Sequence, residues 1–234
     1  MRWQITHGNK LAECQHVVVN SKDILQNRGK LKMQSVILTS NRGNNADLLA
    51  SAFSLYAPDG AIIADLTYGK GSFWKRIDRD KYTALVSDIK PSPEIDARID
   101  FRSLPYKNGS IDLVILDPPY LSGGDTVVGH IHKQYSCDSR TSHQGVIRRY
   151  AAGIVESARV LKQKGKLFIK CQDETVSGKQ HFSHIELIRL LEMLGFKILD
   201  LLILTALNTP CMRHDNQITA RKNHSYLIVG ELRK

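Results

Sequence analysis

The sequence lacks the features that would place a chain in a membrane or outside a reducing compartment. Its densest apolar run, residues 199–207, is interrupted by Asp200 and Thr205. That run has the length of a strand, so we expect no transmembrane helix. Residues 1–7 lack the apolar core of a secretion signal, which favours a cytoplasmic protein. The cysteines are scattered without paired spacing, so we expect free thiols and no disulfide framework; they are Cys14, Cys137, Cys171 and Cys211.

Acidic residues are also scarce relative to basic ones. The chain has 33 Lys and Arg against 23 Asp and Glu, a formal net charge of +10. This balance favours a polyanionic partner, although a solvated basic surface has the same composition. Seven of the basic residues and only two acids lie between Met1 and Asn44. We therefore expect a basic N-terminal segment at 1–44 and a catalytic domain at 45–234.

The stretch from Ile111 to Tyr120 carries the strongest local signal. Residues 111–116 are almost all apolar, which is typical of a strand buried on both faces. Asp117, Pro118, Pro119 and Tyr120 end that strand, because proline cannot donate to a strand ladder. Open α/β folds bind ligands at the carboxyl edge of the sheet. The Asp117 carboxylate and the Pro118 carbonyl would supply two acceptors there for an NH2 group, and Tyr120 an aromatic face.

Three further strand candidates also end in an acid. Asp65 ends a strand at 61–65, Asp88 follows one at 82–87, and Asp100 ends a short one from Ala97. Four acids at the carboxyl ends of strands indicate one site at a common sheet edge. Gly69 and Gly71 lie in the loop after Asp65, where glycine lets the backbone bend and approach a ligand.

The tetrapeptide at 117–120 resembles the catalytic motif of S-adenosylmethionine-dependent DNA amino-methyltransferases, and residues 65–71 are similar to their cofactor loop. The resemblance covers roughly residues 41–229, with the cofactor loop ahead of the tetrapeptide. It departs from the family in size, since there is no room for a large target-recognition domain, and at Thr67, where a phenylalanine-like residue is usual.

This resemblance implies an α/β fold of the Rossmann-like class I methyltransferase type. We expect a mostly parallel seven-stranded sheet with helices on both faces and a C-terminal antiparallel hairpin. The expected strands are 61–65, 82–87, 97–100, 111–116, 166–170, 196–205 and 225–229. Helices are expected at 46–56, from Phe73, at 146–161 and at 184–194.

The resemblance also assigns residues to roles. Asp117, Pro118, Pro119 and Tyr120 would be catalytic. The cofactor, S-adenosyl-L-methionine, would be bound by Asp65, Thr67, Gly69, Gly71, Asp88, Asp100 and Phe101. Asp88 would accept from the ribose hydroxyls, and Asp100 with Phe101 would hold the adenine.

Basic residues outside the core are the expected contacts for nucleic acid. These are Lys30, Lys32, Arg140, Lys179, Arg221 and Lys222. Residues 121–144 are rich in Gly, Ser, Thr and His without an apolar period, which predicts a mobile loop beside the site. The spacing of His130, His132, Cys137 and His143 fits no common zinc pattern, so no metal is expected.

We therefore expect methyl transfer to an exocyclic base amine in DNA, with adenine N6 as the first choice. An RNA base amino-methyltransferase and a catalytically silent nucleic-acid-binding subunit are the alternatives, and the intact Asp117 and Tyr120 speak against the latter. A partner subunit for target recognition is also compatible with the short chain.

Overall fold

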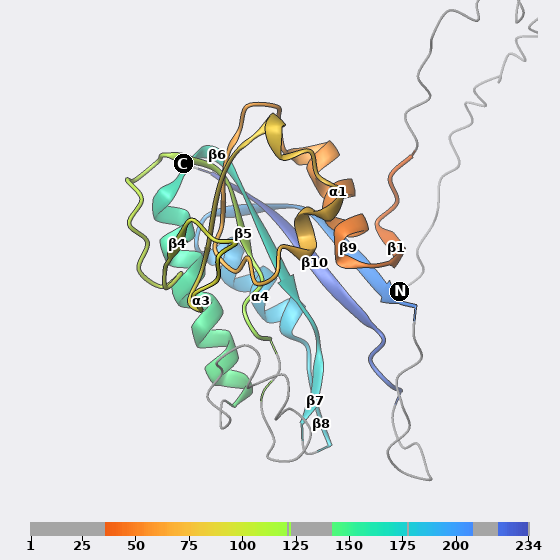
Figure 1. Ribbon diagram of the computed structural model, residues 1–234. Helices are drawn as coiled ribbons and strands as arrows, with labels where there is room; N and C mark the ends of the chain where they lie inside the picture. Colours follow the sequence, from red (N-terminus) through yellow and green to blue (C-terminus); the bar gives the residue numbers. More distant parts are fainter. Residues whose placement is uncertain (1–35, 121, 123–141, 177, 208–219, 234) are drawn as a thin grey trace, which may run out of the picture. The chain divides into compact units, whose positions relative to one another are not determined.

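The structure is a computed structural model that describes residues 36–120, 122, 142–176, 178–207 and 220–233 (Figure 1). Its centre is an eight-stranded sheet with the order β1-β9-β10-β6-β5-β2-β3-β4. The strands are β1 (Ser40–Gly43), β2 (Ile62–Asp65), β3 (Thr83–Asp88), β4 (Ala97–Arg98), β5 (Ile111–Leu116), β6 (Leu161–Cys171), β9 (Phe196–Ala206) and β10 (His224–Leu232).

The predicted α/β fold is confirmed, including its C-terminal hairpin. Strands β4, β3, β2, β5 and β6 are parallel neighbours. Strand β10 is antiparallel to both β6 and β9. The seven expected strands are all present, and β1 adds an eighth by pairing parallel to β9. Strand β1 was not predicted, because its pairing partner lies more than 150 residues further along the chain.

Strand β5 is buried on both faces, as its apolar run predicted. Val114 and Leu116 point into one core cluster, whereas Leu113 and Ile115 point into the other. The first cluster contains residues of α3 (His143–Val160) and α4 (Ser183–Met193), and the second contains residues of α1 (Asn45–Tyr56). Helices thus cover both faces of the sheet, with β5 in the interior (Figure 1).

Local chemistry sets where the helices begin. The Asn44 side chain caps α1 by accepting from the backbone N–H groups of Ala46 and Asp47 at 2.9 and 3.1 Å. Ser142 caps α3, which begins at His143 and so includes two residues assigned to the expected loop. The helix expected from Phe73 is instead a 3-10 turn, η1 (Ser72–Arg76), and a second one, η2 (Arg79–Lys81), follows it.

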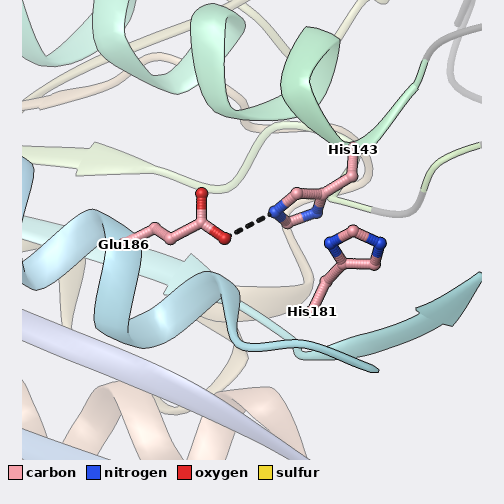
Figure 2. A group of neighbouring side chains, drawn as sticks. All are labelled: His143, His181 and Glu186. Atoms are coloured by element: carbon pink, nitrogen blue, oxygen red, sulfur yellow. Dashed lines mark hydrogen bonds and ion pairs between the residues drawn. The ribbon is translucent and has the colours of Figure 1, made fainter. Parts of the chain in front are cut away.

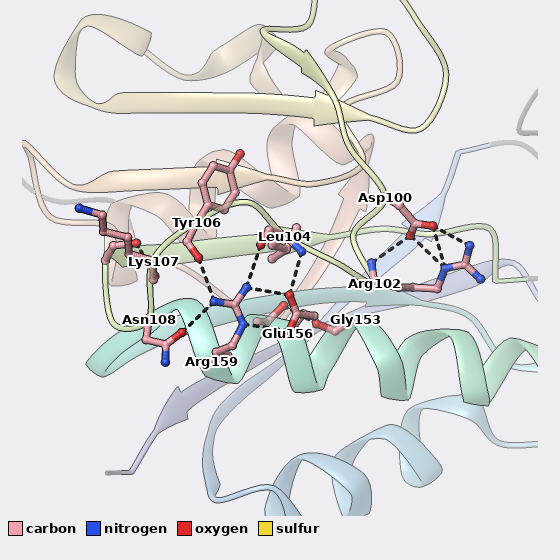
Figure 3. Close-up of polar contacts among 11 residues, drawn as sticks. Asp100, Arg102, Leu104, Tyr106, Lys107, Asn108, Gly153, Glu156 and Arg159 are labelled. Atoms are coloured by element: carbon pink, nitrogen blue, oxygen red, sulfur yellow. Dashed lines mark hydrogen bonds and ion pairs between the residues drawn. The ribbon is translucent and has the colours of Figure 1, made fainter.

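An arginine holds the segment that leads into β5 against α3 (Figure 3). The Arg159 guanidinium donates to the carbonyls of Leu104 and Tyr106 and to Asn108, each at 2.8 Å. Glu156 accepts from the same guanidinium and from the Leu104 N–H at 2.8 Å. The polar groups of this entry segment therefore satisfy one another, which fixes the start of β5.

The compact unit that contains the sheet begins at Ile37. Strand β1 therefore lies within it, although the sequence placed the catalytic domain from residue 45. The role given to residues 1–44 stays a prediction. Among the described residues, no helix is both long and apolar enough to cross a membrane.

Candidate active site

Three of the four predicted acids gather at the carboxyl edge of adjacent strands. Asp65 ends β2, Asp88 ends β3, and Asp117 follows β5 directly. The register brings these ends together, because Asp65 lies opposite Val86 on one side and Ile115 on the other. The antiparallel β10 begins at the same edge, where Tyr226 is opposite Cys171 at the end of β6.

Asp117 is held by its backbone while one side-chain oxygen is left without a partner. Its N–H donates to Thr67 Oγ1 at 2.7 Å. Its Oδ1 atom is buried and has no hydrogen-bond partner among the described residues, although the residue as a whole is partly exposed. Burial raises the pKa of Asp117 to about 6, and the positive charge of Lys170 opposes the rise. A buried acceptor without a donor is costly, and native structures keep few of them.

Asp65 organises the loop that follows it. The side chain is buried and accepts from the Trp74 indole N–H at 2.8 Å and from the Thr67 N–H at 3.1 Å. Burial raises its pKa to about 7 even though these two hydrogen bonds lower it. Since Thr67 also accepts from Asp117, this threonine joins the expected cofactor loop to the expected catalytic tetrapeptide.

Asp88 holds the glycine loop at its tip. One carboxylate oxygen accepts from the Gly69 N–H and the other from the Lys90 N–H, both at 2.9 Å. Gly69 and Gly71 have φ of 58° and 63°, a conformation that other residues rarely adopt. A Cβ on Gly71 would also come within 2.5 Å of the Tyr68 hydroxyl, whereas a Cβ on Gly69 would meet mostly open space. The loop therefore presents backbone at the sheet edge.

Asp100 and Phe101 differ in their surroundings from the other predicted cofactor residues. The Asp100 carboxylate is paired with Arg102, whose Nη2 is 2.6 Å from Oδ2 (Figure 3). These hydrogen bonds lower the pKa of Asp100. The Phe101 side chain is buried in the core beside Gly153 and Leu116. Their role in holding adenine stays a prediction, and for Asp100 it would require sharing the carboxylate with Arg102.

Lys170 of β6 and Ser225 of β10 complete the site, and neither was assigned a role from the sequence pattern. Lys170 is buried, donates to Ser225 Oγ at 2.6 Å and has its Nζ atom 5.8 Å from the centre of the Tyr120 ring. Burial lowers the pKa of Lys170, while Asp117 raises it. A lysine at the end of an apolar strand was the available signal, but the pairing with β10 was not visible in the sequence. Pro118 is buried, and the Pro119 carbonyl accepts from Arg149 at 3.4 Å.

The residues predicted to contact nucleic acid are only partly described. Lys30, Lys32 and Arg140 lie outside the described residues. Lys179 is exposed in β8 (Lys179–His181), which pairs with β7 (Glu174–Val176). Arg221 is exposed ahead of β10, and the Lys222 ammonium lies 5.5 Å from the centre of the Phe182 ring.

A separate hollow of about 450 Å³ lies away from these acids, where β5 and β6 begin. It is lined by residues of the entry segment and α3, among them Asn108, Val155 and Arg159. None of the predicted site residues lines it.

A family model described as DNA methylase matches residues 111–231 of this chain. A search of curated proteins by sequence finds no match. The matched range contains the tetrapeptide at 117–120, Lys170 and the β9–β10 hairpin, but not the glycine loop.

Solved structures share the fold at low sequence identity. A 1,6-didemethyltoxoflavin-N1-methyltransferase from Burkholderia thailandensis aligns at 11% identity and a TM-score of 0.53, covering 81% of this chain and 78% of that one. A SAM-dependent methyltransferase from Methanosarcina mazei aligns at 13% identity and 0.47, covering 78% and 97%. A candidate DNA modification methylase from Thermus thermophilus, complexed with S-adenosyl-L-methionine, aligns at 19% and 0.41, covering 58% and 54%. The chain thus spans about half the length of the Thermus protein.

Proposed function

We propose that this chain, a member of the DNA methylase family, transfers a methyl group from S-adenosyl-L-methionine to the exocyclic amine of a base in DNA, with adenine N6 as the target. The model of that family covers more than half of the chain. The observation that carries the proposal is Asp117 Oδ1, a buried acceptor without a partner among the described residues at the end of the central strand β5.

The described residues fit a nucleoside cofactor beside Asp117. Gly69 leaves open space where a side chain would stand, and Asp88 keeps acceptor capacity beyond its two backbone hydrogen bonds. An acid after the second strand suits the two hydroxyls of a ribose. When bound, S-adenosylmethionine supplies a methyl group on a positively charged sulfur. The residues that would hold it are Asp65, Thr67, Gly69, Gly71 and Asp88.

Asp117 and the Pro118 carbonyl would accept the two N–H groups of the base amine. The amine is a poor nucleophile while its lone pair is delocalised into the ring. Two fixed acceptors favour the tetrahedral nitrogen of the transition state and direct its lone pair toward the methyl group. This geometry fits the amine of adenine and that of cytosine, so product analysis has to separate them.

The amine loses one proton after the methyl group has been transferred. The Asp117 carboxylate, whose pKa is raised to about 6 by burial, is a better proton acceptor than an exposed aspartate and still ionised at pH 7. The neighbouring Lys170 ammonium opposes a further rise in this pKa. Lys170 is therefore a positioning residue that keeps Asp117 available as an acceptor.

Tyr120 and the basic residues would act on the polymer. An aromatic ring that stacks on a flipped base contributes about 1–3 kcal/mol, which offsets part of the stacking lost in the duplex. The Lys170 ammonium lies over the Tyr120 ring, and this cation–π contact helps to hold the ring in position. Lys179, Arg221 and Lys222 offer positive charge for phosphates, as do Lys30, Lys32 and Arg140 outside the described residues.

The test is to incubate the protein with methyl-labelled cofactor and either duplex DNA or RNA, and then to identify the modified base. We expect label in DNA as N6-methyladenine. Label as N4-methylcytosine would change the target base, and label only in RNA would support the alternative substrate. No transfer to either polymer, from protein that binds the cofactor, would contradict the proposed activity.

A further inference from the structure

A second polar cluster, separate from the acids at the strand ends, joins three elements (Figure 2). It contains His143 at the start of α3, His181 at the end of β8 and Glu186 in the first turn of α4. One ligand atom from each of the three side chains lies within 4.8 Å of the others. The cluster was not anticipated, because His143 was assigned to a loop with different histidines.

His143 is oriented by carboxylates on both sides. Its Nδ1 lies 2.9 Å from Glu174 Oε1, and its Nε2 lies 2.8 Å from Glu186 Oε1. Both His143 and Glu174 are buried, whereas 46% of the Glu186 side chain is exposed. A histidine that binds a metal through one ring nitrogen usually donates its other N–H to a carboxylate. Glu174 already holds that second position.

His181 supplies a ring with no described hydrogen bond. Its imidazole stacks on that of His143 with 4.1 Å between the centres and 29° between the planes. Neither of its ring nitrogens bonds to any residue in the part of the chain that the structure describes. A neutral imidazole has one nitrogen that can donate a lone pair to a metal ion.

A divalent cation would fit the charge and the ligand atoms of the cluster. Glu174 and Glu186 place two carboxylates against the buried His143 ring. A cation between His143 Nε2, Glu186 and His181 would neutralise both and use all three groups as ligands.

We propose that His143, His181 and Glu186 bind one zinc ion, with Glu174 holding His143 in the tautomer that zinc requires. Zinc binds imidazole nitrogen and carboxylate oxygen in a tetrahedral arrangement with ligand atoms about 3.3 Å apart. Zinc binding would therefore separate His143 Nε2 and Glu186 Oε1 slightly from their present 2.8 Å, and the other ligand atoms already lie within 4.8 Å of one another. The exposed side of Glu186 leaves the fourth position to a water molecule.

The ion would tie the start of α3 to the segment after the tetrapeptide. Glu174 accepts from both the backbone N–H and the hydroxyl of Ser122, each at 2.8 Å. Ser122 and His143 are therefore joined through one carboxylate. A zinc ion on His143 would stabilise this connection to Ser122, which is two residues after Tyr120 in the chain. The role is structural, and it does not depend on the proposed function.

Zinc binding by the full chain, purified without a polyhistidine tag, tests the site. Zinc content is measured after dialysis into metal-free buffer and after zinc is added back, and Co²⁺ is used as a spectroscopic probe. We expect the wild type to hold about one zinc more per chain than His181→Ala or Glu186→Gln. Its Co²⁺ form should show the intense visible absorption of a tetrahedral site, and added zinc should raise its Tm.

His224→Gln is the matched control, because it removes a partly exposed histidine outside the cluster. It should retain the zinc, and circular dichroism should show that all variants are folded. Glu174→Gln should weaken zinc binding about 10- to 100-fold without abolishing it. Equal zinc content and affinity in the wild type and in His181→Ala, or no binding by the wild type, would overturn the proposal.

Discussion

A carboxylate lies near each end of strand β5, and the two differ in their hydrogen-bond partners. At its entry, Glu156 accepts from Arg159 and from the Leu104 N–H, and these bonds lower the pKa of Glu156 to about 2. At its exit, Asp117 Oδ1 has no partner among the described residues, and burial raises the pKa to about 6. The first arrangement stabilises the fold. The second costs stability and leaves an acceptor for a ligand, which indicates that the site is at the exit.

Asp117→Asn should have the largest effect on activity. The substitution keeps the size of the side chain, but it replaces an acceptor with an amide that can point an N–H at the base amine. Losing one such contact to the transition state costs about 10²–10³-fold in kcat. Steady-state transfer of labelled methyl groups to DNA measures this, and calorimetry with S-adenosylmethionine should show cofactor affinity close to wild type. A rate near that of the wild type would place the acceptor elsewhere.

The pH dependence of transfer should report the same carboxylate. Protonation removes the acceptor, so kcat/KM measured with saturating cofactor should fall about tenfold per pH unit below a pKa of about 6. Lys170→Met removes the charge that lowers the pKa of Asp117, and should therefore move this limb to higher pH. If kcat/KM stays constant over roughly three pH units around the expected pKa, the proposed role of Asp117 is wrong.

Thr67 should have a smaller effect, because it acts on Asp117 through one hydrogen bond. Thr67→Val removes the acceptor for the Asp117 N–H and should lower kcat about five- to tenfold, which corresponds to about 1 kcal/mol. Thr67→Ser keeps the hydroxyl and serves as the matched control. If both variants transfer methyl groups equally well, the hydrogen bond at 2.7 Å does not position the catalytic residue.

Removing the carboxylate should change Tm in opposite directions at the two ends of β5. The folded pKa of Asp117, about 6, lies above its ordinary 3.8. The folded state therefore loses stability as the pH rises through this interval, and Asp117→Asn should raise Tm at pH 8 by a few degrees, roughly 2–4 °C per kcal/mol.

The contribution of Glu156 to stability has the opposite pH dependence. Its folded pKa of about 2 lies below its ordinary 4.5, so its contribution is present above pH 4.5 and is lost as the pH falls toward 2. Glu156→Gln should lower Tm at pH 7 while kcat stays near wild type, and the difference in Tm should narrow in acid. Scanning calorimetry of both variants checks this pair. A drop in Tm for Asp117→Asn together with a rise for Glu156→Gln would reverse the assignment.

The sequence predicted what depends on local patterns. The apolar run at 111–116 is the buried strand β5, and Asp65, Asp88 and Asp117 lie at the carboxyl ends of the strands where they were predicted. Interactions between distant segments were not predictable in this way. Thr67 and Asp117 are hydrogen-bonded although they are 50 residues apart in the sequence, and His143 and Glu174 are 31 residues apart. No local sequence pattern marks either pair. The ion pair between Asp100 and Arg102 was also not predicted, because a sequence motif does not distinguish a paired acid from a free one.

The most direct test compares the modified bases that the wild type and Asp117→Asn produce in the same DNA. Both proteins are first shown to bind S-adenosylmethionine, and the DNA is then digested to nucleosides and separated by chromatography with mass detection. We expect N6-methyladenine from the wild type and at most a trace from the variant. Equal amounts of methylated base from the two proteins would contradict the claim that the Asp117 carboxylate accepts a hydrogen bond from the base amine.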